Sequence, residues 1–211
     1  MPTVNGSFVF TDIVGSSRLW NKYNKKMKTA IDKHEKIIYT LVKKFNGMVV
    51  KTIGDAFMLF FKGKNGYKKA ISCCLELQES LITKPIYLSS LKRDTIRIRI
   101  GICQGPAEVH TVFYQNKKLK DFLGTTVNLA SRMESNVSKK NGIAVCFYKT
   151  PIPIDFMIRA AHKFPNNDLS VNDYTRGCKI RKFKRSGRLI SVRCFNSSLL
   201  HGVPGIKAFT F

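Results

Sequence analysis

Two aspartates stand at positions where a carboxylate could bind a metal ion. Asp12 closes the apolar segment GSFVFTD, and Asp55 lies in the short turn between MVVKT and AFMLFF. A carboxylate at a strand end, beside exposed backbone carbonyls, can bind a hard cation through oxygen atoms alone. Two such carboxylates brought together could hold the paired metal ions of phosphoryl transfer, one activating a nucleophile and one neutralising the phosphates.

Each aspartate also has an ordinary structural explanation. Asp55 could be a simple turn residue, and Asp12, followed by Ser16 and Ser17, could cap the next helix. Either residue taken alone favours the structural explanation. The choice therefore depends on the segments that surround the two aspartates.

The segments that must position the aspartates alternate between strand and helix patterns. GSFVFTD predicts a buried strand, and residues 16–45 carry apolar side chains at helical spacing. Asn46-Gly47 predicts the end of that helix, because both residue types tolerate positive φ. MVVKT and AFMLFF predict a hairpin that turns at residues 53–55, and residues 67–82 predict a second helix.

The second half continues the alternation. IRIRIGIC predicts a strand with one wet face, Gly105-Pro106 a turn, and AEVHTVFY a hairpin partner for that strand. DFLGTTVNLASRMES predicts a loop that becomes a helix near Thr125 or Thr126, followed by the strand GIAVCF and a short helix in DFMIRAAHKF. The tail predicts a basic hairpin that turns at Ser186-Gly187 and a last strand, IKAFTF. Together these elements predict an α+β fold with a mostly antiparallel sheet flanked by helices.

Four ordered segments, FTDIVGSSRLW, NGMVVKTIGDAFMLFF, IRIRIGICQGPAEV and DFLGTTVNLASRMES, resemble the successive blocks of the class III adenylyl and guanylyl cyclase catalytic domain. The resemblance runs from about Phe8 to about Ser135, and HGVPGIKAFTF resembles the end of that domain. It implies one catalytic domain over residues 1–211, with a ferredoxin-like (βαββαβ) core at about 6–150. A divergent basic part with a C-terminal hairpin extension follows at about 164–211.

The resemblance implies a role for each residue that matches a family motif. Asp12 and Asp55, with the backbone carbonyl of Ile13, match the ligands of two Mg²⁺ or Mn²⁺ ions. The triphosphate would lie on backbone amides at the start of the first helix, where unpaired N–H groups and the helix dipole favour phosphate. These amides belong to Val14, Gly15, Ser16 and Ser17.

Four further positions match the residues that bind the nucleoside. Lys51 and Asp121 match a base-reading pair that goes with adenine, because an ammonium and a carboxylate complement its ring nitrogen and its amine. Asn128 matches the ribose-binding asparagine, and Arg132 the arginine that stabilises charge growing in the transition state. The two lie at i and i+4, on one face of a helix. The implied reaction is attack of the ribose 3′-oxygen of ATP on the α-phosphate, giving cyclic AMP and pyrophosphate; no side-chain base stands out.

In this family the sites form where two domains meet head to tail. One domain supplies the metal aspartates, and its partner supplies the residues for base, ribose and transition state. Because both sets occur in this one chain, the resemblance implies a two-fold homodimer with two equivalent composite sites.

Composition limits the class of protein further. The chain has 37 Lys plus Arg against 13 Asp plus Glu, a formal net charge of +24. This charge attracts polyanions such as nucleic acid, anionic lipid or nucleoside triphosphate, although a lysine-rich solvated surface explains it equally well. The six cysteines include no CxxC motif, which argues against a zinc site or disulfide framework. No apolar run is long enough to span a membrane, and no secretory signal opens the chain, so a cytoplasmic protein is expected.

Two features depart from the family pattern. His201 stands where many members have a triphosphate-binding lysine, and residues 164–193 differ from the usual shape. The basic side chains there could contact an anionic partner, such as nucleic acid or a membrane, or form a solvated hairpin. They are Arg176, Lys179, Arg181, Lys182, Lys184, Arg185 and Arg188.

Three alternative functions stay open. The first is a guanylyl or pyrimidine cyclase, the second a catalytically weak, nucleotide-binding cyclase-like domain. The third is a nucleic-acid binder on the related ferredoxin-like fold, which would need stacking aromatics on its sheet.

Overall fold

The structure is a computed structural model of the chain. It describes residues 2–114, 117–137 and 142–148, the single positions 153, 155, 156 and 159, and the strand backbones at 168–173, 180–185 and 188–193. The predicted strand at 206–211, most of the predicted helix at 155–164, and His201 lie outside these residues, as do the basic side chains of the tail.

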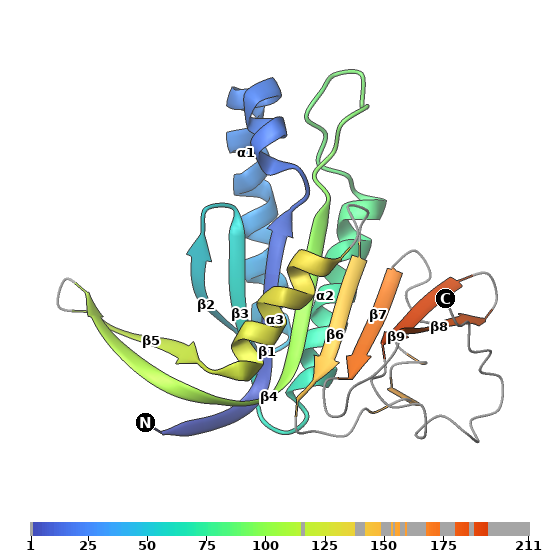
Figure 1. The fold of residues 1–211 in the computed structure, drawn as a ribbon. Helices are drawn as coiled ribbons and strands as arrows, with labels where there is room; N and C mark the ends of the chain where they lie inside the picture. The colour runs from blue at the N-terminus through green and yellow to red at the C-terminus, as the bar shows by residue number, and fades with distance from the viewer. Residues whose placement is uncertain are drawn as a thin grey trace.

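The first six elements form the predicted ferredoxin-like unit. Strands β2, β3, β1 and β4 lie side by side in that order, and each neighbouring pair is antiparallel. This is the βαββαβ arrangement that the sequence predicts (Figure 1). The elements are β1 (Thr3–Ile13), α1 (Ser16–Lys44), β2 (Met48–Ile53), β3 (Ala56–Lys62), α2 (Gly66–Thr83) and β4 (Ile98–Tyr114).

The remaining elements extend this sheet. Strand β6 pairs parallel with β4, β7 with β6 and β9 with β7, while β8 and β9 form the antiparallel pair that the basic hairpin prediction requires. The elements are β5 (Lys117–Leu123), α3 (Thr125–Asn136), β6 (Gly142–Phe147), β7 (Asp168–Asp173), β8 (Ile180–Arg185) and β9 (Arg188–Arg193).

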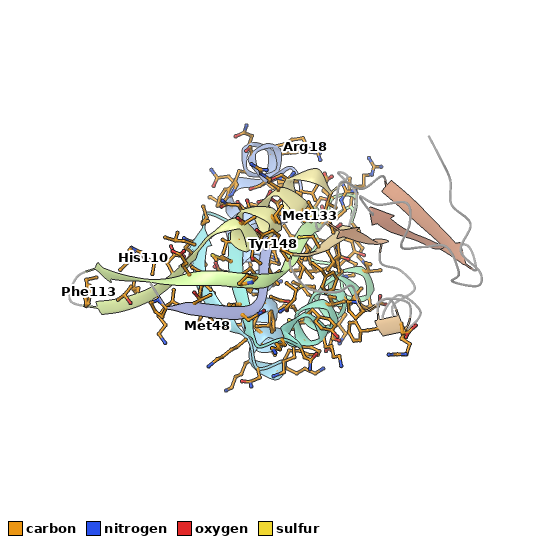
Figure 2. The ribbon with its side chains drawn as sticks, turned by 60° about the horizontal axis from the view of Figure 1, so that its bottom comes forward. Arg18, Met48, His110, Phe113, Met133 and Tyr148 are labelled. Atoms are coloured by element: carbon orange, nitrogen blue, oxygen red, sulfur yellow. The ribbon has the colours of Figure 1, made fainter. Side chains whose placement is uncertain are left out.

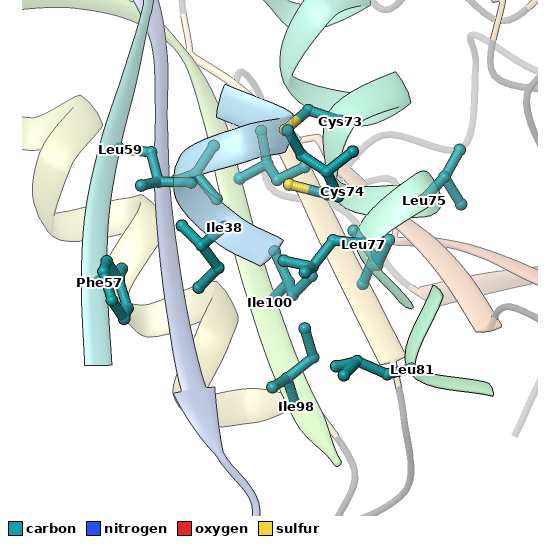
Figure 3. Packing of buried hydrophobic residues seen from close by; sticks show 14 of the residues in the cluster. Ile38, Phe57, Leu59, Cys73, Cys74, Leu75, Leu77, Leu81, Ile98 and Ile100 are labelled. Carbon is teal, nitrogen blue, oxygen red and sulfur yellow. The ribbon is translucent and has the colours of Figure 1, made fainter. Parts of the chain in front are cut away.

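The sheet is buried on both faces because strands β3 and β6 carry apolar side chains at almost every position. In β3, Phe57, Leu59 and Phe61 point to the layer of α1 and α2, whereas Met58 and Phe60 point to the layer of α3. Figure 3 shows the first layer, in which Ile38 of α1 and Leu77 of α2 pack with side chains of the sheet. Figure 1 shows α3 crossing the opposite face.

The predicted turn at Gly105-Pro106 is wrong, because β4 runs through both residues without a break. On one edge, β4 pairs with β6 as far as Gln104 and with β5 from Glu108 onward. Pro106 falls in the gap between these two ladders, where its missing N–H interrupts no pairing. Its carbonyl accepts a hydrogen bond from the Thr126 hydroxyl at the start of α3. The hairpin partner of residues 108–114 is therefore β5, whose last residues were predicted as a loop.

His34 gives the fold a predicted dependence on pH. It is fully buried on α1 against the edge of Phe57, and neither ring nitrogen has a hydrogen-bond partner. Burial lowers the pKa of His34 from 6.5 to about 4. Because the unfolded chain takes up the proton first, the neutral histidine contributes full stability above pH 6.5. That contribution is lost as the pH falls toward 4.

Urea titrations test this dependence. As the pH falls from about 8 to about 5, the shifted pKa of His34 should lower the unfolding free energy of the wild type by about 2 kcal/mol. His34→Leu should lose less stability than the wild type over the same range, by about that amount. Equal losses in the two proteins would contradict the assignment.

Candidate active site

The two metal-site aspartates lie at one edge of the sheet. Strands β1 and β3 pair with Thr11 opposite Phe57, so Asp12, next in β1, and Asp55, just before β3, stand at the same end of neighbouring strands. Asp55 is presented by a tight hairpin in which Ile53 pairs with Ala56. Gly54, at φ +62°, supplies the positive φ that a two-residue hairpin connection favours.

Asp12 is not a helix cap, because Gly15 is the N-cap of α1 and no side chain caps that helix. Instead, an arginine holds the Asp12 carboxylate. Its Oδ2 accepts hydrogen bonds from Arg99 Nη2 at 2.6 Å and Arg99 Nε at 3.1 Å. Arg99 stands directly opposite Asp12 in the β1–β4 ladder and also forms an ion pair with Glu134 of α3. Gly101 lets α3 come this close, since a Cβ there would lie 2.1 Å from the Glu134 amide nitrogen. Burial raises the pKa of Glu134, and the charge of Arg99 offsets part of that rise.

Arg99 is a candidate functional residue that the sequence pattern alone does not indicate. The alternation in IRIRIGIC places it on the polar side of a strand, but the carboxylate that it meets depends on the register of a strand 87 residues away. Its position between Asp12 and Glu134 makes it part of the candidate site.

The surroundings of Asp55 fit a divalent cation, whereas at Asp12 a cation would share the carboxylate with Arg99 or displace it. Asp55 Oδ2 is buried and has no hydrogen-bond partner, which is costly for a carboxylate oxygen unless a cation neutralises it. In the part of the chain that the structure describes, no three acidic, histidine or cysteine side chains form a metal-binding cluster. A bound ion would therefore need backbone or substrate oxygens beside the two carboxylates, as Mg²⁺ sites commonly do.

The start of α1 presents unpaired amides beside these carboxylates. Gly15 is the N-cap in a left-handed conformation, no side chain caps the helix, and its first turn has no acidic residue. The first N–H groups of a helix have no partner within it, so Gly15, Ser16 and Ser17 can offer theirs to an anion. The amide of Val14 differs, because it donates to the Arg97 carbonyl at 2.8 Å.

Lys51 and Asp121 form an ion pair across two strands, with 2.5 Å between Nζ and Oδ2. Lys51 lies on β2, and Asp121 lies on β5 rather than in the predicted loop. The other carboxylate oxygen, Oδ1, accepts a hydrogen bond from the Phe122 amide, which fixes its direction. Both side chains remain partly exposed, at 43% and 22%, so the pair is accessible to a ligand.

Asn128 and Arg132 lie on α3, as predicted, and both are exposed. The opposite side of α3 packs on the sheet through buried side chains that include Ala130 and Met133. Among the described residues, no hydrogen bond or ion pair joins Asn128 or Arg132 to either aspartate. One chain thus brings Lys51 to Asp121 and Arg99 to Asp12, but leaves the α3 pair facing outward.

Strands β4 and β5 form an arm that projects from the body of the protein (Figure 1). Figure 2 shows Phe113 at the tip of this arm, where it is 74% exposed. Val112, Leu119 and Leu123 are also exposed on the arm. An exposed apolar group of this kind indicates a surface that another chain can cover.

The sequence matches a known protein family whose fold and site residues agree with those described above. Residues 2–148 match the family described as the adenylate and guanylate cyclase catalytic domain. The chain therefore belongs to this family of lyases, whose members generally depend on a metal ion.

Known proteins show how far the similarity extends. An adenylate cyclase of Podospora anserina is 32% identical over 148 residues, covering 64% of this chain but only 7% of that protein. The structure of the guanylyl cyclase Cya2 superposes with a TM-score of 0.63 at 14% identity, covering 92% of this chain and 91% of that one. The structure of a class III adenylyl cyclase-like ATP-binding protein from Pseudomonas aeruginosa superposes with a TM-score of 0.62 at 15% identity. This match covers 77% of this chain and 40% of that one. No helix in the described part of the chain is both long and apolar enough to cross a membrane.

Proposed function

We propose that this domain converts ATP to 3′,5′-cyclic AMP and pyrophosphate. The observation that carries the proposal is the Lys51–Asp121 pair, which presents an ammonium and a carboxylate side by side. Adenine offers an acceptor ring nitrogen and a donor amine, so it complements the two groups, whereas guanine offers the reverse pattern at the same edge. The 32% identity to a fungal adenylate cyclase supports the same choice.

The other site residues take roles that their positions allow. The amides of Gly15, Ser16 and Ser17 would hold phosphate oxygens at the positive end of α1. Asn128 would orient the ribose, and Arg132 would stabilise the charge that grows on the α-phosphate. Asp12, Asp55 and the Ile13 carbonyl would hold two Mg²⁺ or Mn²⁺ ions, which lower the pKa of the 3′-hydroxyl and neutralise the phosphates when bound.

The site is proposed to form between two copies of the chain. In one copy the outward-facing Asn128 and Arg132 have no bond to Asp12 or Asp55 among the described residues, so a second copy is needed to complete the set. The exposed apolar arm, with Phe113 at its tip, offers a surface for that contact.

Complementation tests the shared site. Asp12→Ala and Arg132→Ala proteins should each be inactive, because each lacks one half of every site. After mixing and subunit exchange, heterodimers regain one intact site, so activity should return to about a quarter of the wild-type level. Heterodimers that form without any recovery of activity would contradict the shared site.

A second candidate is a nucleotide-binding domain with weak turnover. The bond between Arg99 and Asp12 favours it, because a metal ion must displace this arginine or share the carboxylate with it. Incubation with ATP and Mn²⁺, read by mass spectrometry, separates the two candidates. Cyclic AMP supports the cyclase, and bound but unchanged ATP supports the second candidate.

A further inference from the structure

A pocket of about 200 Å³ lies beside the start of α1, on the side of the segment that precedes β4. Figure 2 shows Arg18 at this end of the protein, away from the tip of the arm. Three arginines and one acid are among its lining residues, which include Val14, Arg18, Arg93, Asp94 and Arg97. The pocket therefore carries more positive than negative charge.

The one acid in this pocket is already neutralised by other residues. Asp94 Oδ2 accepts a hydrogen bond from Lys22 Nζ at 2.9 Å and another from the Tyr23 hydroxyl. These two hydrogen bonds lower the pKa of Asp94. Arg18 also helps to lower the pKa of Asp94 through its charge, but none of the three guanidinium groups, those of Arg18, Arg93 and Arg97, forms an ion pair with a carboxylate among the described residues.

Several hydrogen bonds fix the walls of the pocket. The Val14 amide donates to the Arg97 carbonyl, which joins the end of β1 to the segment before β4. Within that segment, Leu88 N donates to Asp94 O at 2.8 Å and Arg93 N donates to Ser89 Oγ at 3.2 Å. The bonds of Lys22 and Tyr23 to Asp94 tie the first turns of α1 to the same segment. The arginines therefore extend from a defined frame.

We infer that this arginine pocket binds the terminal phosphates of the triphosphate and holds pyrophosphate after cyclisation. The inference rests on the proposed function. Val14 lines the pocket and directly precedes the amides of residues 15–17, so a triphosphate that lies on those amides can continue into the pocket. Guanidinium groups suit this role because their forked donors match phosphate oxygens, and their hydrogen bonds to charged oxygens are strong.

Calorimetric titration with inorganic tripolyphosphate tests the inference without turnover. The triple variant Arg18→Gln, Arg93→Gln, Arg97→Gln should raise the Kd for tripolyphosphate about 10- to 100-fold, from the loss of charge-assisted hydrogen bonds. The Kd for ATP should rise similarly, while the Kd for AMP should change less than about 3-fold.

A matched control variant distinguishes the effect of the pocket arginines from the effect of a lower net positive charge. Lys25, Lys28 and Lys33 are exposed on α1, and changing all three to Gln removes the same charge from another surface. The control should bind tripolyphosphate nearly as the wild type does. An equal loss in both triple variants, or a wild type that does not bind tripolyphosphate, would overturn the inference.

The titration also separates this inference from the proposed function. If tripolyphosphate binding depends on the pocket but ATP gives no cyclic AMP, the pocket stands and the cyclase proposal fails. If ATP is cyclised and the pocket variant binds tripolyphosphate as tightly as the wild type, the cyclase proposal stands and the pocket fails.

Discussion

Replacing Asp55 with asparagine is expected to lower cyclase turnover by at least about three decades. A carboxylate that holds a catalytic cation supports several kcal/mol of charge stabilisation, and each 1.4 kcal/mol corresponds to about one decade in rate. Asp55→Ala and Asp12→Ala should likewise abolish product formation. In the wild type, Mn²⁺ is expected to support more turnover than Mg²⁺.

Stability measurements separate a catalytic role for Asp55 from a structural one. Because Asp55 Oδ2 is buried without a partner, removing its charge should leave the unfolding temperature unchanged or raise it. A residue important for folding would instead lower that temperature. Asp32→Asn is the matched control, since Asp32 is an exposed acid on α1, and it should keep full turnover. Undiminished product from Asp55→Ala without metal would refute the metal assignment.

The local pattern of the sequence predicts the βαββαβ core well because each element carries its own signal. Residues 16–45 show the helical apolar period, and Asn46, observed at φ 54°, ends the helix as predicted. The hairpin at Gly54 follows from a glycine between two apolar strands. Such signals depend only on residues that are neighbours in the sequence, so they can be recognised without the tertiary structure.

The wrong predictions concern features set by pairing between distant strands. Gly105-Pro106 has the composition of a turn, but a proline is tolerated within a strand where that edge has no partner. Whether the edge is free depends on where β6 ends and β5 begins. The contact of Arg99 with Asp12 depends likewise on the β1–β4 register. The local sequence pattern does not indicate that Lys51 and Asp121 lie together, but the family resemblance does. The structure shows that they form an ion pair.

Base selection is the second prediction with a large expected effect. Lys51 and Asp121 are partly exposed in the free protein, but a bound base would cover them. A covered donor or acceptor that guanine leaves without a matching partner costs about 1–3 kcal/mol. Two such groups, Lys51 and Asp121, imply that kcat/KM for ATP exceeds that for GTP by roughly one to four decades. The measurement is the wild-type kcat/KM for ATP, GTP, CTP and UTP under identical metal conditions.

A double variant tests whether the pair itself reads the base. Lys51→Glu with Asp121→Cys should weaken ATP use and raise GTP use relative to it, because the donor and acceptor positions are then exchanged. Lys120→Glu is the control: Lys120 is exposed beside Asp121, and alternation along the strand turns it to the other face, so this charge change should leave the ATP preference intact. A wild type that prefers CTP or UTP would show that Lys51 and Asp121 do not read adenine, and a pyrimidine cyclase would then be the better assignment.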